Sequence, residues 1–290
     1  MKQIKRFLSL SLVFALLFTA LWPAAQPVTA RAAVSALGNV IGAQVNGSTL
    51  VLTVDSGSSS ADKLTLEVCD EDILRVNYQP DGAPSSKQTP IIDPDLKWDA
   101  SAAVINTSSD PITIKTDEMQ VEINKKPCRM TVKKADGTTL FWEPQSGGVS
   151  QGSVRFVRQD SSNLYGIHSF DCFEENGNLL RNDNSKAARA GQQGNSGGPF
   201  LWSTAGYGLL VDSDGGYPYT NSKDKKMEFY YGGTPEEGRR YEKNNLEYYI
   251  LLGEPKEIMK GYSKITGTSP MLPKWAQGFS NFEWVSMRRK

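Results

Sequence analysis

From residue 40 onward, apolar and polar residues alternate in many short runs, which is the pattern of half-buried β-strands. Clusters of Gly, Asn, Asp and Ser separate these runs, as expected for turns between strands. The predicted strands cover residues 40–45, 49–54, 63–68, 73–78, 112–115, 119–123, 129–133, 138–142, 154–157, 207–211, 227–231 and 246–252. Many short strands at this spacing are typical of a sandwich. The sequence therefore predicts an all-β domain over residues 34–254.

Two strand pairs carry a sequence signal for a tight hairpin turn. Asn46-Gly47 lies between the first two predicted strands, and Asp136-Gly137 lies between two later ones. Two longer stretches interrupt the pattern. Residues 80–109 are rich in Pro, Ser, Asp and Ala and predict a long surface excursion. Residues 174–198 are polar, with several Asn and Gly, and such a long loop is either functional or a disordered surface segment.

One amphipathic helix is predicted after the last strand. Pro255 suits a first helical turn, and Ile258, Tyr262 and Ile265 fall on one face. Gly267 suits the C-terminal cap, and two prolines that follow prevent continuation. We interpret residues 255–270 as a C-terminal linker helix leading to a further domain.

The first 33 residues have the pattern of a secretory signal peptide. Lys2, Lys5 and Arg6 form a basic head, and an apolar run follows over residues 7–22. Small residues then lead to expected cleavage after Ala30 or Ala33. The alternative is a retained membrane anchor, but this run is shorter than the roughly 20 apolar residues that a span needs. We expect a secreted, extracellular protein with no membrane association after cleavage.

Composition excludes several function classes. Lys plus Arg and Asp plus Glu number 32 each, so there is no electrostatic case for nucleic acid or an anionic membrane. Cys69, Cys128 and Cys172 allow at most one bridge and do not resemble a zinc site. They are interpreted as small buried apolar residues or as one optional disulfide. With a single histidine, His168, and no clustered Asp-x-Asp loop, we expect no metal and no cofactor.

Residues 194–199, Gly-Asn-Ser-Gly-Gly-Pro, look like the nucleophile loop of a serine protease. Such a serine needs a base within hydrogen-bond reach and a third group that orients the base. The only histidine, His168, lies shortly before Ser196, and Asn195 stands where the loop normally has Asp. The glycines are better explained as a tight turn into a strand.

Several longer motifs occur together. They are Ile-Leu-Arg-Val at 73–76, a Tyr-Gly start at 165–171, Pro-Phe followed by Gly-Tyr-Gly at 199–212, a Tyr-rich strand with Gly-Glu-Pro at 248–258, and Leu-Pro-Lys-Trp-Ala-Gln-Gly-Phe at 272–279. The chain resembles, on these motifs, the N-terminal domain of glycoside hydrolase family 31, the α-glucosidase and α-xylosidase family. The resemblance covers residues 40–284. One departure is Tyr-Gly-Ile-His-Ser at 165–169, where many members have Tyr-Gly-Leu-Gly-Glu.

The resemblance implies a galactose-mutarotase-like β-sandwich (supersandwich) that packs against a (β/α)8 barrel. The family cleaves or transfers α-glycosides with retention, which needs two carboxyl groups about 5–5.5 Å apart. Both catalytic aspartates of the family lie in the barrel, and no residue of this chain matches them. The expected partners are an α-linked oligosaccharide or polysaccharide and the missing barrel.

A substrate-binding segment is implied by the same resemblance. The family's long loop, which here corresponds to residues 170–198, helps to shape the subsites at the barrel mouth. Aromatic rings there could stack on a sugar, and polar side chains could bind hydroxyl groups. The candidate substrate-binding residues are Phe170, Asp171, Arg181, Asn182 and Asp183.

The last residues depart from the family pattern. Members continue after Phe-Glu-Trp with glycine and an acidic helix start, whereas this chain reads Val-Ser-Met-Arg-Arg-Lys over 285–290. Loss of one G near the Trp284 codon would convert Gly-Ile-Asp-Glu-Glu-Lys into this sequence. We hypothesise that a frameshift truncated a longer enzyme. Residues 271–290 are then the start of a truncated barrel, with a disordered, exposed apolar tail beyond about Ser269.

Three functional hypotheses follow. The first is the N-terminal substrate-shaping domain of a retaining α-glycosidase or transglycosylase, inactive alone. The second is a stand-alone secreted carbohydrate-binding sandwich, which would need an exposed aromatic platform. No clustered run of Trp and Tyr in the sequence makes that case. The third is a docking domain for a separate barrel chain.

Overall fold

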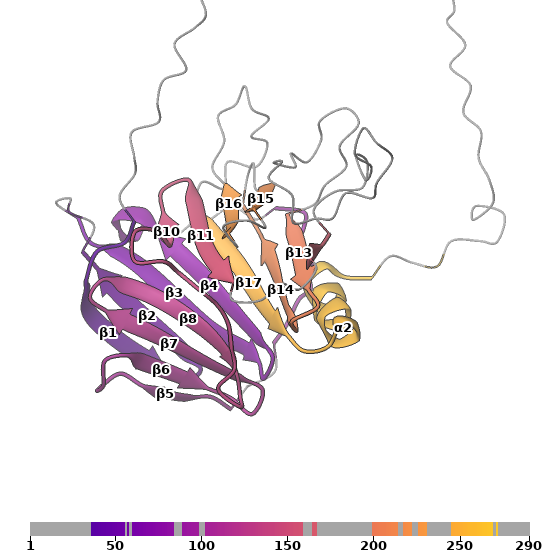
Figure 1. Ribbon diagram of the computed structural model, residues 1–290, viewed down its shortest axis with the longest axis horizontal. Helices are drawn as coiled ribbons and strands as arrows, with labels where there is room; N and C mark the ends of the chain where they lie inside the picture. The colour runs from indigo at the N-terminus through magenta and orange to yellow at the C-terminus, as the bar shows by residue number, and fades with distance from the viewer. Residues whose placement is uncertain are drawn as a thin grey trace, which may run out of the picture. The chain divides into compact units, whose positions relative to one another are not determined.

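The computed structural model describes residues 36–55, 57, 60–83, 89–98, 102–158, 164–166, 199–213, 217–221, 226–230, 245–268 and 271. In these residues two antiparallel sheets stack face to face (Figure 1). The first sheet has the spatial order β1 (Val40–Asn46), β2 (Thr49–Val54), β3 (Asp62–Asp70), β4 (Ile73–Gln79), β17 (Leu246–Leu252), β14 (Tyr207–Val211), β13 (Phe200–Ser203), β12 (Leu164–Tyr165). The second has the order β15 (Tyr217–Asn221), β16 (Lys226–Tyr230), β11 (Ser153–Arg158), β9 (Thr139–Trp142), β8 (Cys128–Lys134), β7 (Met119–Lys125), β6 (Ile112–Lys115), β5 (Val104–Asn106), and β10 (Val149–Ser150) pairs with β11.

This architecture confirms the all-β sandwich that the period-two pattern predicts. Every predicted strand is present, and no predicted bound differs from the observed one by more than two residues. The strands that the pattern missed are β5, β10, β12, β13 and β15. Two of them, β10 and β12, have only two residues, which is too short to show an alternation.

The main core lies between the two sheets. In β2, Leu50, Leu52 and Val54 are fully buried, and the residues between them are only half-buried. They belong to one apolar cluster with residues of the second sheet such as Ile112 and Ile114. Each sheet therefore turns one apolar face toward the other, and burial of these faces is the main stabilising contribution.

The strand β17 differs, because all seven of its residues are buried. Its inner face contributes to the main core, while Tyr249 and Leu251 belong to a second cluster on the outer face. That outer cluster also contains Ile258 and Ile265 of the helix α2 (Pro255–Thr266), which lies beside β13 and β14 in Figure 1. A continuous apolar strand is thus explained by cover on both faces.

The helix α2 confirms the amphipathic pattern. Ile258 and Ile265 are fully buried, and the ring of Tyr262 packs on Phe200 of β13 at 4.4 Å between centroids. The helix ends at Thr266, earlier than the predicted boundary at 270, and Gly267 follows with a φ of 75°. Positive φ is accessible to glycine without steric cost, so Gly267 accounts for the end of the helix.

Two local predictions need correction. In the first hairpin, Asn46 pairs with Thr49, so the turn residues are Gly47 and Ser48 rather than Asn46 and Gly47. The predicted surface excursion at 80–109 is in part a packing element. Its Thr89 is buried, and Ile91, Ile92, Leu96 and Trp98 pack against the outer cluster.

The predicted signal peptide and the predicted exposed tail lie outside the described residues, apart from Met271, which is exposed. Two of the three cysteines, Cys69 and Cys128, are buried free thiols, as the apolar interpretation expects. Within the ranges that the structure describes, no helix has the length and apolar character needed to cross a bilayer.

Candidate functional site

The five sequence-predicted sugar-binding residues, Phe170, Asp171, Arg181, Asn182 and Asp183, lie outside the described residues. The structure does define where their segment is attached. It follows β12 and precedes β13, and these two strands pair antiparallel at one edge of the first sheet. In the described residues, polar or aromatic clusters that could form a site lie at this edge and elsewhere in the sandwich.

An ion-pair cluster occupies the outer face of the first sheet. Arg75 of β4 donates through Nε and Nη2 to the two carboxylate oxygens of Glu247 of β17, at 3.1 and 3.0 Å. Its Nη1 donates to Oε2 of Glu67 on β3 at 3.1 Å. Asn77 Nδ2 donates to Glu247 Oε2 at 2.6 Å. The cluster joins three neighbouring strands in one hydrogen-bonded row.

The electrostatics of this cluster indicate a structural role. Burial opposes the charge of Arg75, but Glu247 outweighs it, and the pKa of Arg75 lies above its usual range. The cluster lines a hollow of about 180 Å³ together with Thr65 and Gln79. Nε, Nη1 and Nη2 of Arg75 all donate to carboxylates of the neighbouring strands. Arg75 therefore links β3, β4 and β17. In the sequence, Arg75 stands out only as part of the Ile-Leu-Arg-Val motif at 73–76, and its carboxylate partners are not predicted.

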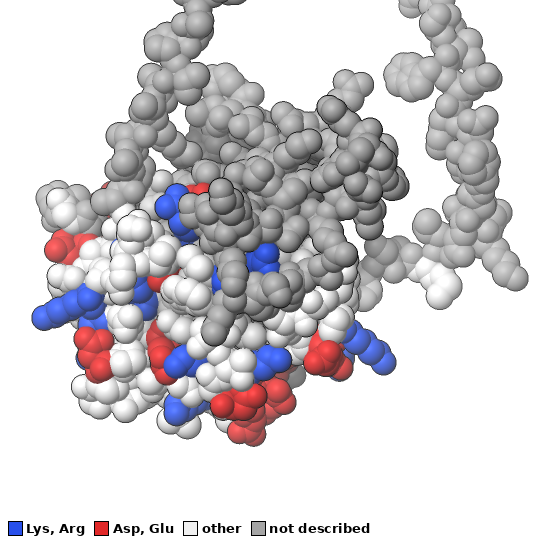
Figure 2. Space-filling view, viewed as in Figure 1, with Lys and Arg blue, Asp and Glu red and all other residues white. Residues whose placement is uncertain are grey.

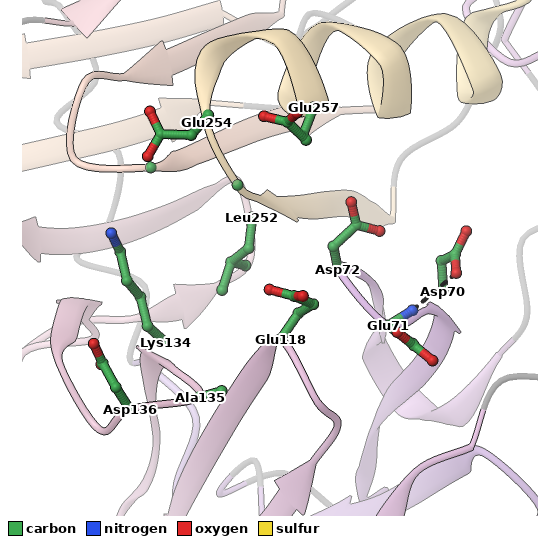
Figure 3. A pocket seen from close by; sticks show the side chains of 12 residues that line it. Asp70, Glu71, Asp72, Glu118, Lys134, Ala135, Asp136, Leu252, Glu254 and Glu257 are labelled. Carbon is green, nitrogen blue, oxygen red and sulfur yellow. Dashed lines mark hydrogen bonds between the residues drawn. The ribbon is translucent and has the colours of Figure 1, made fainter.

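A larger acidic hollow of about 700 Å³ opens at the end of the sandwich where α2 begins (Figure 3). It is formed by the turn between β3 and β4, the residue before β7, the turn between β8 and β9, and the first turn of α2. Its charged lining residues are Asp70, Glu71, Asp72, Glu118, Lys134, Asp136, Glu254 and Glu257. On the side of the molecule seen in Figure 2, acidic and basic side chains are otherwise interspersed.

Two carboxylates of the hollow, Asp70 and Asp72, have pKa values that are shifted in opposite directions. A hydrogen bond from Lys264, at 2.8 Å, holds the pKa of Asp70 below its usual value. Partial burial, and then the charge of Asp70, raise the pKa of Asp72. Among the described residues no group of His, Cys, Asp or Glu has an arrangement that could hold a metal ion. The hollow therefore concentrates negative charge at one end of the domain, without the geometry of a metal site.

A buried carboxyl group, that of Glu143, directly follows β9 and contacts β8. Glu143 is 5% exposed, and its Oε2 accepts a hydrogen bond from the backbone N–H of Met130 at 3.1 Å. Burial raises the pKa of Glu143 to about 7, against the opposing effects of that hydrogen bond and of Arg129. A titrating group near neutral pH is typical of active sites. Because this one is enclosed by the core, it acts on stability rather than on a ligand.

An aromatic pair lies at the edge of the first sheet. Tyr165 of β12 stands directly opposite Trp202 of β13, and their rings stack with 4.6 Å between centroids and an angle of 22°. Trp202 packs against the outer cluster, whereas Tyr165 is 40% exposed. The sequence has no clustered run of Trp and Tyr and does not predict this pair, because strand pairing brings its two members together.

The described residues thus define a two-sheet antiparallel sandwich that carries a helix on the outer face of one sheet. A family model for the glycosyl hydrolase 31 N-terminal galactose mutarotase-like domain matches residues 63–214, just over half of the chain. This chain belongs to glycoside hydrolase family 31. The resemblance inferred from the motifs is confirmed, and so is the galactose-mutarotase-like fold.

Individual relatives agree with this assignment. A 1,6-alpha-glucosyltransferase of Sporosarcina globispora is 56% identical over 284 residues, which is 98% of this chain and 22% of that protein. An isomaltosyltransferase of the same organism is 24% identical over 77% of this chain and 20% of its own length. The chain therefore spans about a fifth of the length of these curated relatives.

Solved structures show the same fold. A GH31 dextranase of Flavobacterium johnsoniae complexed with isomaltotriose matches 84% of this chain and 30% of its own, with a TM-score of 0.66 and 21% identity. A cycloalternan-forming enzyme of Listeria monocytogenes in complex with a pentasaccharide substrate matches 83% of this chain and 23% of its own, with a TM-score of 0.65 and 23% identity.

Proposed function

We propose that this chain is the N-terminal substrate-shaping domain of a secreted, retaining enzyme that transfers or hydrolyses α-glucosyl groups. The single observation that carries the proposal is the 56% identity to a 1,6-alpha-glucosyltransferase along 98% of the chain. Identity at this level over a whole domain favours the same role in a similar enzyme. It also favours an α-glucoside over the α-xyloside that the motifs left open.

The role that we infer for the sandwich is to support the substrate at the mouth of a catalytic barrel. The segment with Phe170, Asp171 and the other candidate sugar-binding residues is attached to β12 and β13, at an ordered sheet edge. The paired strands β12 and β13 fix the two ends of this segment on the sandwich. The catalytic carboxylates that retention requires are expected from the barrel, so we propose that the 290-residue chain has no catalytic activity alone.

A domain exchange tests the proposal. Residues 34–284 of this chain would replace the matching region of the Sporosarcina 1,6-alpha-glucosyltransferase, and the 1,6-α-glucosyl transfer activity of the chimera would be measured. We expect the chimera to keep transferase activity, while the 290-residue chain alone shows none. The matched control carries the corresponding region of the isomaltosyltransferase, and we expect it to lose activity. A folded but inactive chimera, or transfer by the chain alone, contradicts the proposal.

A second candidate function is carbohydrate binding by the isolated sandwich. The observation that favours it is the exposed ring of Tyr165, which stacks on the partly buried Trp202. The domain exchange distinguishes the candidates, because a sandwich that only binds sugar would bind isomaltotriose but would not give an active chimera.

A further inference from the structure

We propose that Tyr165, supported from behind by Trp202, is a stacking platform for one glucosyl residue of an α-linked gluco-oligosaccharide. The inference rests on the proposed function, since it assigns the site at which the domain contacts its substrate. It uses only residues that the structure describes, and it is separate from the five candidates in the segment that follows β12.

The first argument is the exposure of the ring. Among the large apolar side chains that are exposed in the described residues, Tyr165 alone carries an aromatic ring; the others are Ile41, Val45, Val104, Met259 and Met271. The face of an aromatic ring carries partial negative charge. A pyranose presents C–H groups of opposite polarity on its flat face, so an exposed ring is matched to a sugar in both shape and charge.

The second argument is that the ring is held in place before a ligand arrives. Tyr165 pairs with Trp202 across β12 and β13, and the indole stacks against one face of the phenol ring. The indole in turn packs on the cluster that contains Phe200 and the helix residue Ile258. A platform with fixed rotamers loses little conformational entropy on binding, which increases the affinity that a single stacking contact can give.

The third argument is position. Gly166 directly follows the platform with a φ of 95°, and a Cβ there would lie 2.8 Å from the carbonyl oxygen of Phe200. Gly166 thus adopts a backbone conformation that other residues rarely adopt, and no side chain at 166 covers the ring. The segment with the predicted sugar-binding residues leaves and rejoins the sheet at the same two strands. A sugar on Tyr165 would lie where the domain is expected to meet its substrate.

The direct test is binding of isomaltotriose and of maltotriose to the full 290-residue chain, measured by calorimetry and by saturation-transfer NMR. We expect weak binding that Tyr165→Ala reduces about tenfold or more and that Tyr165→Phe retains, because the ring carries the contact. Val104→Ala is the matched control, since it also removes an exposed apolar side chain from an edge strand, β5 of the other sheet. It should leave affinity unchanged.

A second variant tests the supporting role of the indole. Trp202→Leu keeps an apolar side chain on the outer cluster but removes the stacked ring. We expect an affinity between those of the unchanged protein and Tyr165→Ala and a weaker saturation-transfer signal on the sugar, with a melting temperature close to that of Tyr165→Ala. A variant that melts far lower is replaced in the test by Trp202→Phe, which should retain most of the affinity.

The outcomes separate the two proposals. If the chain binds neither sugar, or if Tyr165→Ala binds as tightly as the unchanged protein, the platform is wrong. The domain exchange can still succeed in either case, and the proposed function then stands. If the platform binds sugar but the folded chimera is inactive, the proposed function fails and the sugar-binding site remains.

Discussion

Arg75 of β4 and Glu247 of β17 form a bidentate ion pair that connects strands from opposite ends of the domain sequence. The carboxylate is almost fully buried, with 6% of the Glu247 side chain exposed, whereas about a third of Arg75 reaches solvent. Glu247 also accepts a hydrogen bond from Asn77. The pair therefore fixes the register of β4 on β17 on the face opposite the main core.

Replacement of Arg75 should destabilise the domain. Arg75→Met leaves Glu247 as a buried carboxylate without its cation, and we expect a loss of about 2 kcal/mol in the free energy of unfolding, since partial exposure reduces the full penalty. The matched control is Lys133→Met, which removes a pair with Glu122 at 2.7 Å. The Glu122 side chain is 25% exposed, against 6% for Glu247, so this change should cost about 0.5 kcal/mol or less. Urea unfolding measures both, and equal losses contradict the structural role of Arg75.

The buried Glu143 should make stability depend on pH. Its folded-state pKa is raised from 4.5 to about 7 by burial, so its contribution to stability is full below pH 4.5 and is lost as the pH rises through 7. The loss corresponds to about 3 kcal/mol at most. Glu143→Gln cannot ionise and keeps an acceptor for the Met130 N–H. The stability of this variant relative to the unchanged protein should rise between pH 4.5 and pH 8, and a constant difference contradicts this prediction.

The contact between β14 and α2 should tolerate no larger residue at Gly208. A Cβ at this position would lie 2.8 Å from Cγ2 of Ile258, a branched side chain with restricted rotamers. Gly208→Ala should therefore cost about 1–3 kcal/mol through overpacking. Gly42→Ala on β1 is the control, because its nearest contacts are ordinary ones at 3.4 Å. We expect no loss there, and thermal unfolding compares the two variants.

Removal of a negative charge from the acidic hollow should change stability in opposite directions at Asp72 and at Asp136. Burial and Asp70 raise the pKa of Asp72, so Asp72→Asn should increase stability at neutral pH, where its charge is unfavourable. Hydrogen bonds from Thr138 lower the pKa of Asp136, so Asp136→Asn should reduce stability above pH 4. Added salt should reduce the stability gained by Asp72→Asn, because it screens the repulsion from Asp70. Changes of the same sign in melting temperature at pH 7 would argue against this electrostatic account.

Much of the fold could be predicted from the sequence because the evidence for it is local. The alternation in residues 49–54 and 119–123 is visible in any short window, and so is the helical spacing of Ile258, Tyr262 and Ile265. The segment around residues 89–98 was assigned to the surface since its Pro and Asp content resembles a loop, although its apolar residues pack on the outer cluster. Composition does not reveal that the apolar residues of a loop-like segment pack against a distant cluster.

The class of fold, the family and the buried faces of the strands can all be inferred from residue type and from the period along the chain. Which distant residues meet depends on how the strands pair in three dimensions. Tyr165 faces Trp202, and Arg75 binds Glu247, because β12 pairs with β13 and β4 with β17. A period of two states which side chains share a face, but it does not state which strands are neighbours. The platform and the ion-pair cluster both depend on that choice of neighbours.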